Sequence, residues 1–361
     1  FHNPDVVDAC MDVLRFWLDR GVDGFRLDVA NSYVHDPKLT DNPPMPMNER
    51  TAADWAHAPR LQRHIKDANT PENAWSMMRV RQVMDEYENR LAFGEFSEEP
   101  SMFGVYAGGP TKLHTGYTFD FLEDRSFKPK VFRKYYEELL APLDDLWPCV
   151  TFSNHDIVRP VTRWGGGQGD DALAKLALTL LLTLKGTALM YQGEELGLPD
   201  VDLERKWIKD PVGDLYFPFG KGRDGCRTPM PWKPDAHEAG FTSGDAWLPI
   251  PAYHRSRTAD AQEHDGASVL VHAKHIIATR KRHPALLLGE IAFAKEDDDK
   301  VLVFTREGGG ETLLCLFNLS REAASHAVPA NAHATEVMCG EVERDGGMVT
   351  LGARSAAVFS V

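Results

Sequence analysis

The sequence predicts an α/β fold with parallel strands, followed by a small antiparallel β domain. Over most of the chain, short apolar segments that end in charged residues alternate with amphipathic segments of helical period. This order is typical of parallel strands joined by crossover helices. After Pro284 the helical segments stop, and short strand-like segments separated by turn residues follow, which is typical of an antiparallel sheet. We therefore expect an α/β domain over residues 1–284 and a β domain over residues 285–361.

Four apolar segments are predicted to be buried strands, each of which opens into a polar loop. They cover residues 22–28, 91–95, 149–156 and 188–194, and residues 116–122 form a weaker fifth candidate. Parallel strands present their carboxyl ends on one side of a sheet, and polar residues stand at those ends here. We therefore expect a functional site on that side.

Helices are predicted where apolar residues recur with helical spacing. They cover residues 4–20, 72–90, 129–140, 170–184 and 268–283, and residues 199–253 are predicted to be a long loop. The longest apolar-rich stretch, residues 173–184, is interrupted by Lys175. It is too short to cross a bilayer, which takes about 20 apolar residues, so we expect a buried helix there.

The composition excludes some classes of protein. A hydrophobic fraction of 43% is enough for a sizeable core and excludes wholesale disorder. The net charge of −14 repels phosphate, so we expect no nucleic-acid partner, and no membrane partner is expected either. Five scattered cysteines without a CxxC pair predict reduced thiols and a cytoplasmic location. A periplasmic location and the oligomeric state stay open.

Asp28 ends the first predicted strand, two residues after Arg26. Side chains two residues apart on a strand share a face, so the guanidinium and the carboxyl group are expected to point the same way. A neighbouring guanidinium keeps a carboxylate ionised, as a nucleophile requires. A structural ion pair at the strand end is the alternative interpretation.

Two further predicted strands end in acidic residues. Glu95 follows Gly94, which lets other groups approach the backbone closely, and an apolar strand end favours the protonated carboxyl group that a general acid needs. Asp156 follows Asn154 and His155, for which a cluster that caps the next helix is the alternative. Three acidic residues at the ends of parallel strands would meet at one mouth of an α/β barrel. Paired carboxylates in a cleft are what cleavage of a glycosidic bond needs.

These segments resemble the signature of the α-amylase superfamily, glycoside hydrolase family thirteen. Residues 23–28 (DGFRLD) resemble the stretch with its nucleophile, residues 93–95 (FGE) the stretch with its general acid/base, and residues 152–156 (FSNHD) the stretch with its third carboxylate. Residues 186–197 are similar to the last barrel strand and its loop. The resemblance implies that Asp28 attacks the anomeric carbon, that Glu95 protonates the leaving oxygen, and that Asp156 holds hydroxyls of the distorted ring. It also implies that Arg26 and His155 contact the glucose.

The segment expected to follow the barrel narrows the resemblance to one subgroup of the family. Residues 223–232 (RDGCRTPMPW) resemble that segment in bacterial α-glucosidases and oligo-1,6-glucosidases, with Arg223 and Arg227 as expected substrate-binding residues. Val29 follows the expected nucleophile. Among the α-glucosidases that this chain resembles, enzymes with valine at this position look like the type that prefers α-1,6 linkages. Enzymes with alanine or threonine there look like the type that prefers α-1,4 linkages. Simple packing is the alternative, because one residue near the +1 subsite shifts specificity by only about 1–3 kcal/mol.

On the same resemblance, the sequence begins just before the helix that precedes the fourth barrel strand. The expected fold class is therefore strands four to eight of a (β/α)8 TIM barrel, followed by a small antiparallel β-sandwich. A third-strand motif that binds the sugar, and a structural Ca or Mg site of some relatives, would precede Phe1. We expect no cofactor or metal within residues 1–361, and we expect this segment alone to be inactive.

The resemblance implies a retaining, exo-acting α-glucosidase. It would release terminal α-1,4- or α-1,6-linked glucose from short oligosaccharides such as maltose or isomaltose, so the expected partner is a small α-glucoside. An α-glucosyltransferase shares every motif and is the first alternative. A non-catalytic, amylase-like sugar-binding protein is the second, although such proteins usually lack the carboxylates that are present here.

Overall fold

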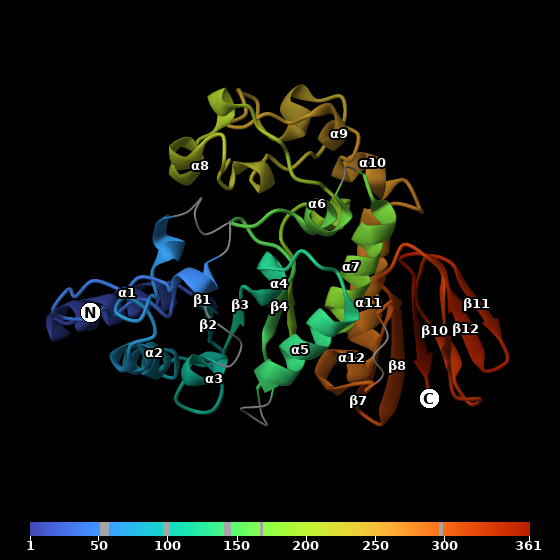
Figure 1. The fold of residues 1–361 in the computed structure, drawn as a ribbon, viewed down its shortest axis with the longest axis horizontal. Coiled ribbons are helices and arrows are strands. Elements are labelled where there is room, and N and C mark those ends of the chain that lie inside the picture. The colour runs from blue at the N-terminus through green and yellow to red at the C-terminus, as the bar shows by residue number, and fades with distance from the viewer. Residues whose placement is uncertain (51–57, 97–101, 141–145, 167–168, 296–298) are drawn as a thin grey trace. The chain divides into compact units, whose positions relative to one another are not determined.

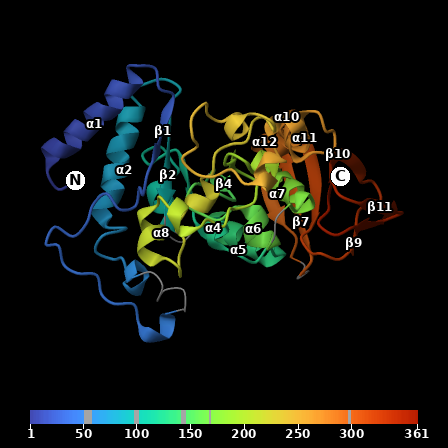
Figure 2. The ribbon, with the colours of Figure 1, turned by 90° about the horizontal axis from the view of Figure 1, so that it is seen from above.

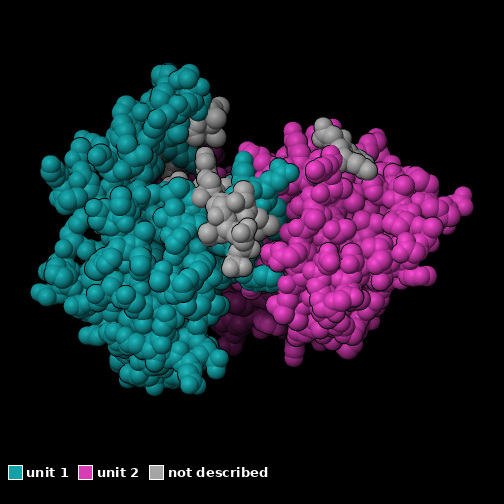
Figure 3. All heavy atoms as spheres, turned by 90° about the horizontal axis from the view of Figure 1, so that it is seen from below, with its two compact units in different colours: residues 1–121, 135–149 teal, residues 122–134, 150–361 magenta. Residues whose placement is uncertain are grey.

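The computed structural model describes residues 1–50, 58–96, 102–140, 146–166, 169–295 and 299–361. The chain divides into two compact units, which Figure 3 shows in different colours. The first unit holds residues 1–121 and 135–149, and the second holds residues 122–134 and 150–361. The chain passes between the units within helix α4 (Asp120–Glu123), helix α5 (Pro129–Leu140) and strand β4 (Cys149–Thr151).

A three-stranded parallel sheet forms the centre of the first unit. Strands β1 (Gly24–Leu27), β2 (Leu91–Phe96) and β3 (Thr115–Thr118) lie in the order β1-β2-β3. The register pairs Gly24 with Leu91 and Glu95 with Tyr117. The parallel arrangement predicted from the alternation of strands and helices is confirmed for these strands, and the weaker candidate at residues 116–122 contributes one of them.

Two paired glycines decide which face of this sheet carries polar side chains. A Cβ atom on Gly94 would lie 2.4 Å from the ring of Phe96, and one on Gly116 would lie 2.3 Å from the same ring. The ring of Phe96 therefore lies over the glycine pair, as the expected close approach at Gly94 requires. Because side chains alternate between faces, Glu95 and Tyr117 project together from the opposite face.

Helices α1 (Pro4–Leu18) and α2 (Pro71–Met84) lie side by side, and α2 packs against β2 (Figure 2). The side chain of Asn3 accepts the backbone N–H of Asp5 and caps α1. Helix α2 ends six residues before the predicted end, at a turn in which Asn89 has a positive φ of 55°. Shorter elements of this unit are η1 (Met47–Glu49), η3 (Ala58–Leu61) and α3 (Phe103–Tyr106).

In the second unit, helices α7 (Asp171–Thr183) and α11 (Val269–Arg282) run side by side (Figure 1). Their contact includes Ala174, Leu178, Val269 and Ala273, which lie in one buried cluster. Helix α6 (Pro160–Gly165) precedes α7, and strand β5 (Thr187–Leu189) follows it and pairs with β4. In the described part of the chain, no helix is long and apolar enough to span a bilayer.

The prediction of one long loop over residues 199–253 was incomplete, because short helices interrupt it. They are η6 (Arg205–Trp207), α8 (Pro211–Tyr216), η7 (Asp224–Cys226), η8 (His237–Gly240) and α9 (Ala252–Arg255); η5 (Glu194–Leu196) precedes the segment and α10 (Ala259–Glu263) follows it. Side-chain bonds stabilise the turn that leads into α8. The Asp210 carboxylate accepts the N–H of Val212, and the Asp224 carboxylate accepts the N–H groups of Lys209 and Asp210. Helices of one or two turns leave no periodic apolar pattern from which to predict them.

Helix α12 (Pro284–Leu288) leads into two antiparallel sheets. The first has the order β10-β13-β8-β7-β6 and the second the order β11-β12-β9. Their strands are β6 (Glu290–Phe293), β7 (Val301–Gly308), β8 (Glu311–Asn318), β9 (Ala324–Ala327), β10 (His333–Cys339), β11 (Val342–Asp345), β12 (Met348–Leu351) and β13 (Ala356–Ser360). The four-residue strands β6, β9, β11 and β12 were not predicted individually.

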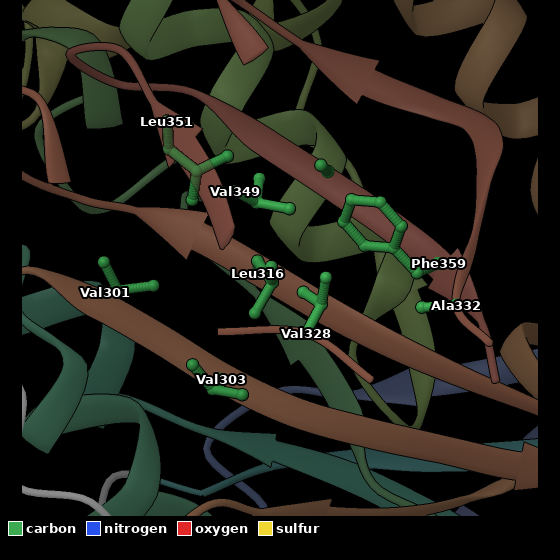
Figure 4. Packing of buried hydrophobic residues seen from close by; sticks show 9 residues of the cluster. Val301, Val303, Leu316, Val328, Ala332, Val349, Leu351 and Phe359 are labelled. Carbon is green, nitrogen blue, oxygen red and sulfur yellow. The ribbon is translucent and has the colours of Figure 1, made fainter. Parts of the chain in front are cut away.

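Side chains from both sheets share one hydrophobic core (Figure 4). Val303, Leu316 and Phe359 come from the five-stranded sheet, and Val349 and Leu351 come from the three-stranded sheet. Leu316 and Val349 are completely buried. This core holds the two sheets together, as a sandwich requires.

We predict that Leu316→Ala lowers the free energy of unfolding of this β domain by about 2–5 kcal/mol, because it leaves a cavity between the sheets. Urea denaturation followed by circular dichroism would measure the loss. Glu343→Ala on the exposed strand β11 is the control. Equal stabilities of the two variants would contradict the assignment of Leu316 to the core.

Candidate active site

Arg26 binds two of the carboxyl groups predicted to be catalytic. Its Nη1 donates to Oδ1 of Asp28 at 2.8 Å, and its Nη2 forms an ion pair with Oε1 of Glu95 at 2.7 Å. Burial alone would lower the pKa of Arg26, but hydrogen bonds to Tyr117 and Asp28 raise that pKa above the usual value. The guanidinium is therefore charged, and it lies beside Asp28 as the spacing of the two residues on the strand predicts.

The two carboxyl groups differ strongly in exposure. The side chain of Asp28, directly after β1, is 71% exposed, whereas that of Glu95, inside β2, is 5% exposed. An exposed, ion-paired carboxylate can reach a ligand while it stays ionised. A buried carboxyl group takes up a proton more readily than an exposed one, unless its partners favour the charge.

Tyr117 is part of this cluster, and the sequence prediction missed it. Its hydroxyl donates to Oε1 of Glu95 at 2.7 Å and accepts from Nη2 and Nε of Arg26 at 3.2 and 3.4 Å. Burial is the main cause that raises the pKa of Tyr117, so the phenol keeps its proton. The signal that could have found it is the register of β2 and β3, which places Tyr117 opposite Glu95.

The backbone after Asp28 is bound to the end of β2. Val29 donates its N–H to Oε2 of Glu95 at 3.2 Å, and Ala30 donates its N–H to the carbonyl of Glu95 at 2.9 Å. Val29 has a φ of +43°, which is strained for a β-branched residue. Its side chain is exposed.

In the second unit, both arginines predicted to bind substrate contact Asp156. Nη1 of Arg223 lies 3.0 Å and Nη2 of Arg227 lies 2.8 Å from Oδ1 of Asp156. Arg227 also donates from Nε to the carbonyl of His155 at 2.6 Å. The imidazole Nε2 of His155 lies 3.5 Å from Oδ2 of Asp156. The structure thus brings these four predicted residues together.

Asp156 does not lie at the end of a strand, so the predicted strand over residues 149–156 was too long. Strand β4 ends at Thr151, and the side chain of Asn154 accepts the N–H of Asp156 at 2.9 Å in the turn that follows. Local bonds from asparagine compete with strand pairing and explain the early end. The predicted strand over residues 188–194 likewise ends at Leu189, before Glu194 in η5.

Asp210 is a second residue of the site that the prediction missed. Its two carboxylate oxygens accept from Nη2 and Nε of Arg223, both at 2.9 Å, and its side chain is completely buried. The hydrogen bonds from Arg223 are the main cause that lowers the pKa of Asp210 to about 2. Asp210 thereby holds the guanidinium of Arg223 in place, and Nη1 of the same guanidinium contacts Asp156. The sequence signal that could have identified Asp210 is its position directly before Pro211, at the start of α8.

The described residues contain no group of three or more His, Cys, Asp or Glu side chains placed to hold a metal ion. All five cysteines are free thiols. Among the described residues, the cluster around Arg26 in the first unit consists of carboxyl groups, one arginine and one phenol, and the cluster around Asp156 in the second unit consists of carboxyl groups, two arginines and one imidazole.

Comparisons with known proteins define the family. Residues 1–289 match the family model for the alpha amylase catalytic domain, and residues 291–358 match that for the maltogenic amylase C-terminal domain. The chain belongs to the α-amylase family: it carries the catalytic domain of that family with a C-terminal β-rich domain.

Two of the relatives are glucosidases by name. The chain is 44% identical over 334 residues to a Rhizobium meliloti protein named "Probable alpha-glucosidase", covering 91% of this chain and 60% of the relative. It is 28% identical over 366 residues to an oligo-1,6-glucosidase of Parageobacillus thermoglucosidasius, covering 91% of this chain and 62% of that enzyme. The chain thus spans about three fifths of the length of these relatives.

Two solved structures have the same fold. An alpha-glucosyl transfer enzyme is 40% identical with a TM-score of 0.94, over 100% of this chain and 68% of that one. A trehalulose synthase from Pseudomonas mesoacidophila is 24% identical with a TM-score of 0.83, over 100% of this chain and 69% of that one.

We predict that Asp210→Asn destabilises the second unit by about 2 kcal/mol at pH 7, because Arg223 lowers the pKa of Asp210 from 3.8 to about 2 in the folded state. A carboxyl group with a lowered pKa stabilises the fold above its unfolded pKa, and this contribution is lost as the pH falls toward 2. The stability difference between wild type and variant should therefore shrink from pH 5 to pH 2.

Urea denaturation at several pH values would measure this difference, with the exposed Asp235→Asn as control. A difference that stays constant with pH would show that the ionised form of Asp210 is not what stabilises the loop.

Proposed function

We propose that the whole protein is a retaining, exo-acting α-glucosidase that releases terminal α-linked glucose from short oligosaccharides. The observation that carries this proposal is the single guanidinium of Arg26 that binds both Asp28 and Glu95. One cation between two carboxyl groups favours the separation of about 5–5.5 Å typical of retaining enzymes. The similarity to the Rhizobium meliloti protein supports the choice of substrate class.

In the first step, a carboxylate oxygen of Asp28 bonds to the anomeric carbon while the glycosidic C–O bond breaks. Glu95 gives its proton to the leaving oxygen. The exposure of Asp28 and the burial of Glu95 support this division of roles. Arg26 keeps Asp28 ionised until the bond forms.

In the second step, the Glu95 carboxylate takes a proton from water as the water oxygen bonds to the anomeric carbon. The ester bond to Asp28 breaks, and glucose leaves with its configuration retained. We propose that Asp156 and His155 bind hydroxyls of the glucosyl unit and that Arg223 and Arg227 orient Asp156, which their contacts with it support.

The finer fold assignment also remains a proposal. We propose that β1 to β5 correspond to strands four to eight of a (β/α)8 barrel and that the β domain starts near residue 285. The absence of a cofactor from residues 1–361, a cytoplasmic location and the inactivity of this chain alone stay predictions. Assaying the chain beside the whole protein would test the last of them.

A second candidate is an α-glucosyltransferase, favoured by the likeness to a solved alpha-glucosyl transfer enzyme at 40% identity. Both activities pass through the same glucosyl-enzyme, and they differ in whether water or a sugar hydroxyl accepts the glucose. The ratio of free glucose to transfer product from maltose at rising maltose concentration would separate them.

We predict that Asp28→Ala lowers release of α-glucose from maltose and isomaltose by the whole protein by about 10³-fold or more, because the covalent step is lost. Asp23→Ala is the control, since Asp23 lies on the same segment with a side chain that is 96% exposed. The control should keep nearly full activity. Undiminished activity of Asp28→Ala would overturn the assignment of the nucleophile.

We predict that Val29→Thr shifts linkage preference from isomaltose toward maltose by up to about tenfold in the ratio of kcat/KM values, the range one side chain contributes through shape. Val29 follows Asp28, its side chain is exposed, and threonine keeps the β-branched shape. Steady-state kinetics on both disaccharides would measure the ratio. An unchanged ratio would leave packing as the role of Val29.

A further inference from the structure

We propose that Tyr117 is a positioning residue for the acid/base carboxyl group: its hydroxyl fixes Oε1 of Glu95 and couples Glu95 to Arg26. This inference rests on the proposed function of Glu95 and adds a residue that no sequence motif identified. The side chain of Tyr117 is buried within the same unit as both partners.

The direction of each hydrogen bond follows from chemistry. Arginine has only donors, so the phenol oxygen must accept from Arg26. Its single proton is then directed to Oε1 of Glu95, 2.7 Å away. The phenol therefore transmits the positive charge of Arg26 to Glu95, in addition to the direct 2.7 Å contact of the guanidinium with the same oxygen.

The sheet fixes the phenol in this position. Strand β3 pairs with β2 in a register that places Tyr117 opposite Glu95, and Gly94 and Gly116 pair behind them under the ring of Phe96. A side chain on either glycine would push that ring away. The hydroxyl of Tyr117 is thus held by backbone pairing on one face and by close packing on the other.

The contacts of the two Glu95 oxygens assign the catalytic proton to one of them. Oε1 accepts from the Tyr117 hydroxyl at 2.7 Å and lies 2.7 Å from the charged Nη2 of Arg26, while Oε2 accepts one backbone N–H, from Val29, at 3.2 Å. A proton on Oε1 would displace the hydrogen bond from Tyr117 and face the positive charge of Arg26, so the acid form carries its proton on Oε2. That proton moves to the leaving oxygen as Asp28 bonds to the anomeric carbon, and Oε2 later accepts one from water.

The change Tyr117→Phe removes one donor from the carboxylate and loosens its position. Hydrogen bonds to charged groups are strong enough to move a titration by about one pH unit. We therefore expect the alkaline limb of the kcat/KM profile to move upward by about one pH unit.

Substrates with poor leaving groups depend on acid catalysis, so kcat/KM for methyl α-glucoside should fall about tenfold or more in Tyr117→Phe. That for p-nitrophenyl α-glucoside should change less than about threefold, because nitrophenolate needs little protonation.

The experiment compares the whole wild-type protein with Tyr117→Phe and with Tyr106→Phe. Tyr106 is also buried in the first unit, and its hydroxyl donates to Oδ1 of Asn69 at 2.9 Å, away from Glu95. The control should leave the alkaline limb and the ratio of the two substrates unchanged. Equal losses on both substrates with an unmoved alkaline limb in Tyr117→Phe would reduce Tyr117 to a structural role and overturn the proposal.

A second measurement does not depend on activity. Carbon-13 NMR of labelled glutamate carboxyl groups, with Glu95 identified by Glu95→Gln, would follow its titration in wild type and in Tyr117→Phe. A titration that moves upward in Tyr117→Phe without any glucosidase activity in wild type would support the positioning role and refute the proposed function. An active wild type with an unmoved Glu95 titration would refute the positioning role alone.

Discussion

The charge of Arg26 is the constraint on which the arrangement of the first unit depends. Two carboxylates at neighbouring strand ends repel each other, and a buried one such as Glu95 would lose its hydration without compensation. One guanidinium between Asp28 and Glu95 removes both problems. The sheet then only has to hold three strand ends in register, which the backbone pairing of β1, β2 and β3 does.

The second unit solves a similar problem with two arginines on one carboxylate. Asp156 binds Arg223 and Arg227, so its charge is more than balanced. The excess positive charge is offset by Asp210, which is buried behind Arg223 and has its pKa lowered to about 2, mainly by its bonds to that arginine. Rows of alternating charge of this kind orient long side chains that would otherwise sample many rotamers.

Local signals in the sequence were enough for part of this arrangement. Alternation on a strand placed Arg26 beside Asp28, and the family motifs indicated the loop that carries Arg223 and Arg227. Tyr117 and Asp210 escaped prediction because their roles come from partners distant in sequence: Tyr117 acts on Glu95 through strand register, and Asp210 acts on Arg223 through a turn. The short helices between residues 199 and 253 escaped because helices of one or two turns leave no periodic apolar pattern; among these described helices, only α8 has a side-chain cap, from Asp210.

Under the proposed role of Val29 in linkage preference, its positive φ links that preference to folding. Holding a β-branched residue in that conformation costs on the order of 1–3 kcal/mol, which the surrounding structure must supply. An exchange of Val29 for a residue that is not β-branched therefore alters two properties at once, the shape of the surface beside Asp28 and the backbone strain. Glycine would release the strain and keep the N–H that binds Glu95, but it would remove the side chain beside Asp28. Variants at position 29 that are selected for new linkages should therefore be made in a stabilised form of the protein. A change in substrate recognition can then be told apart from a loss of stability.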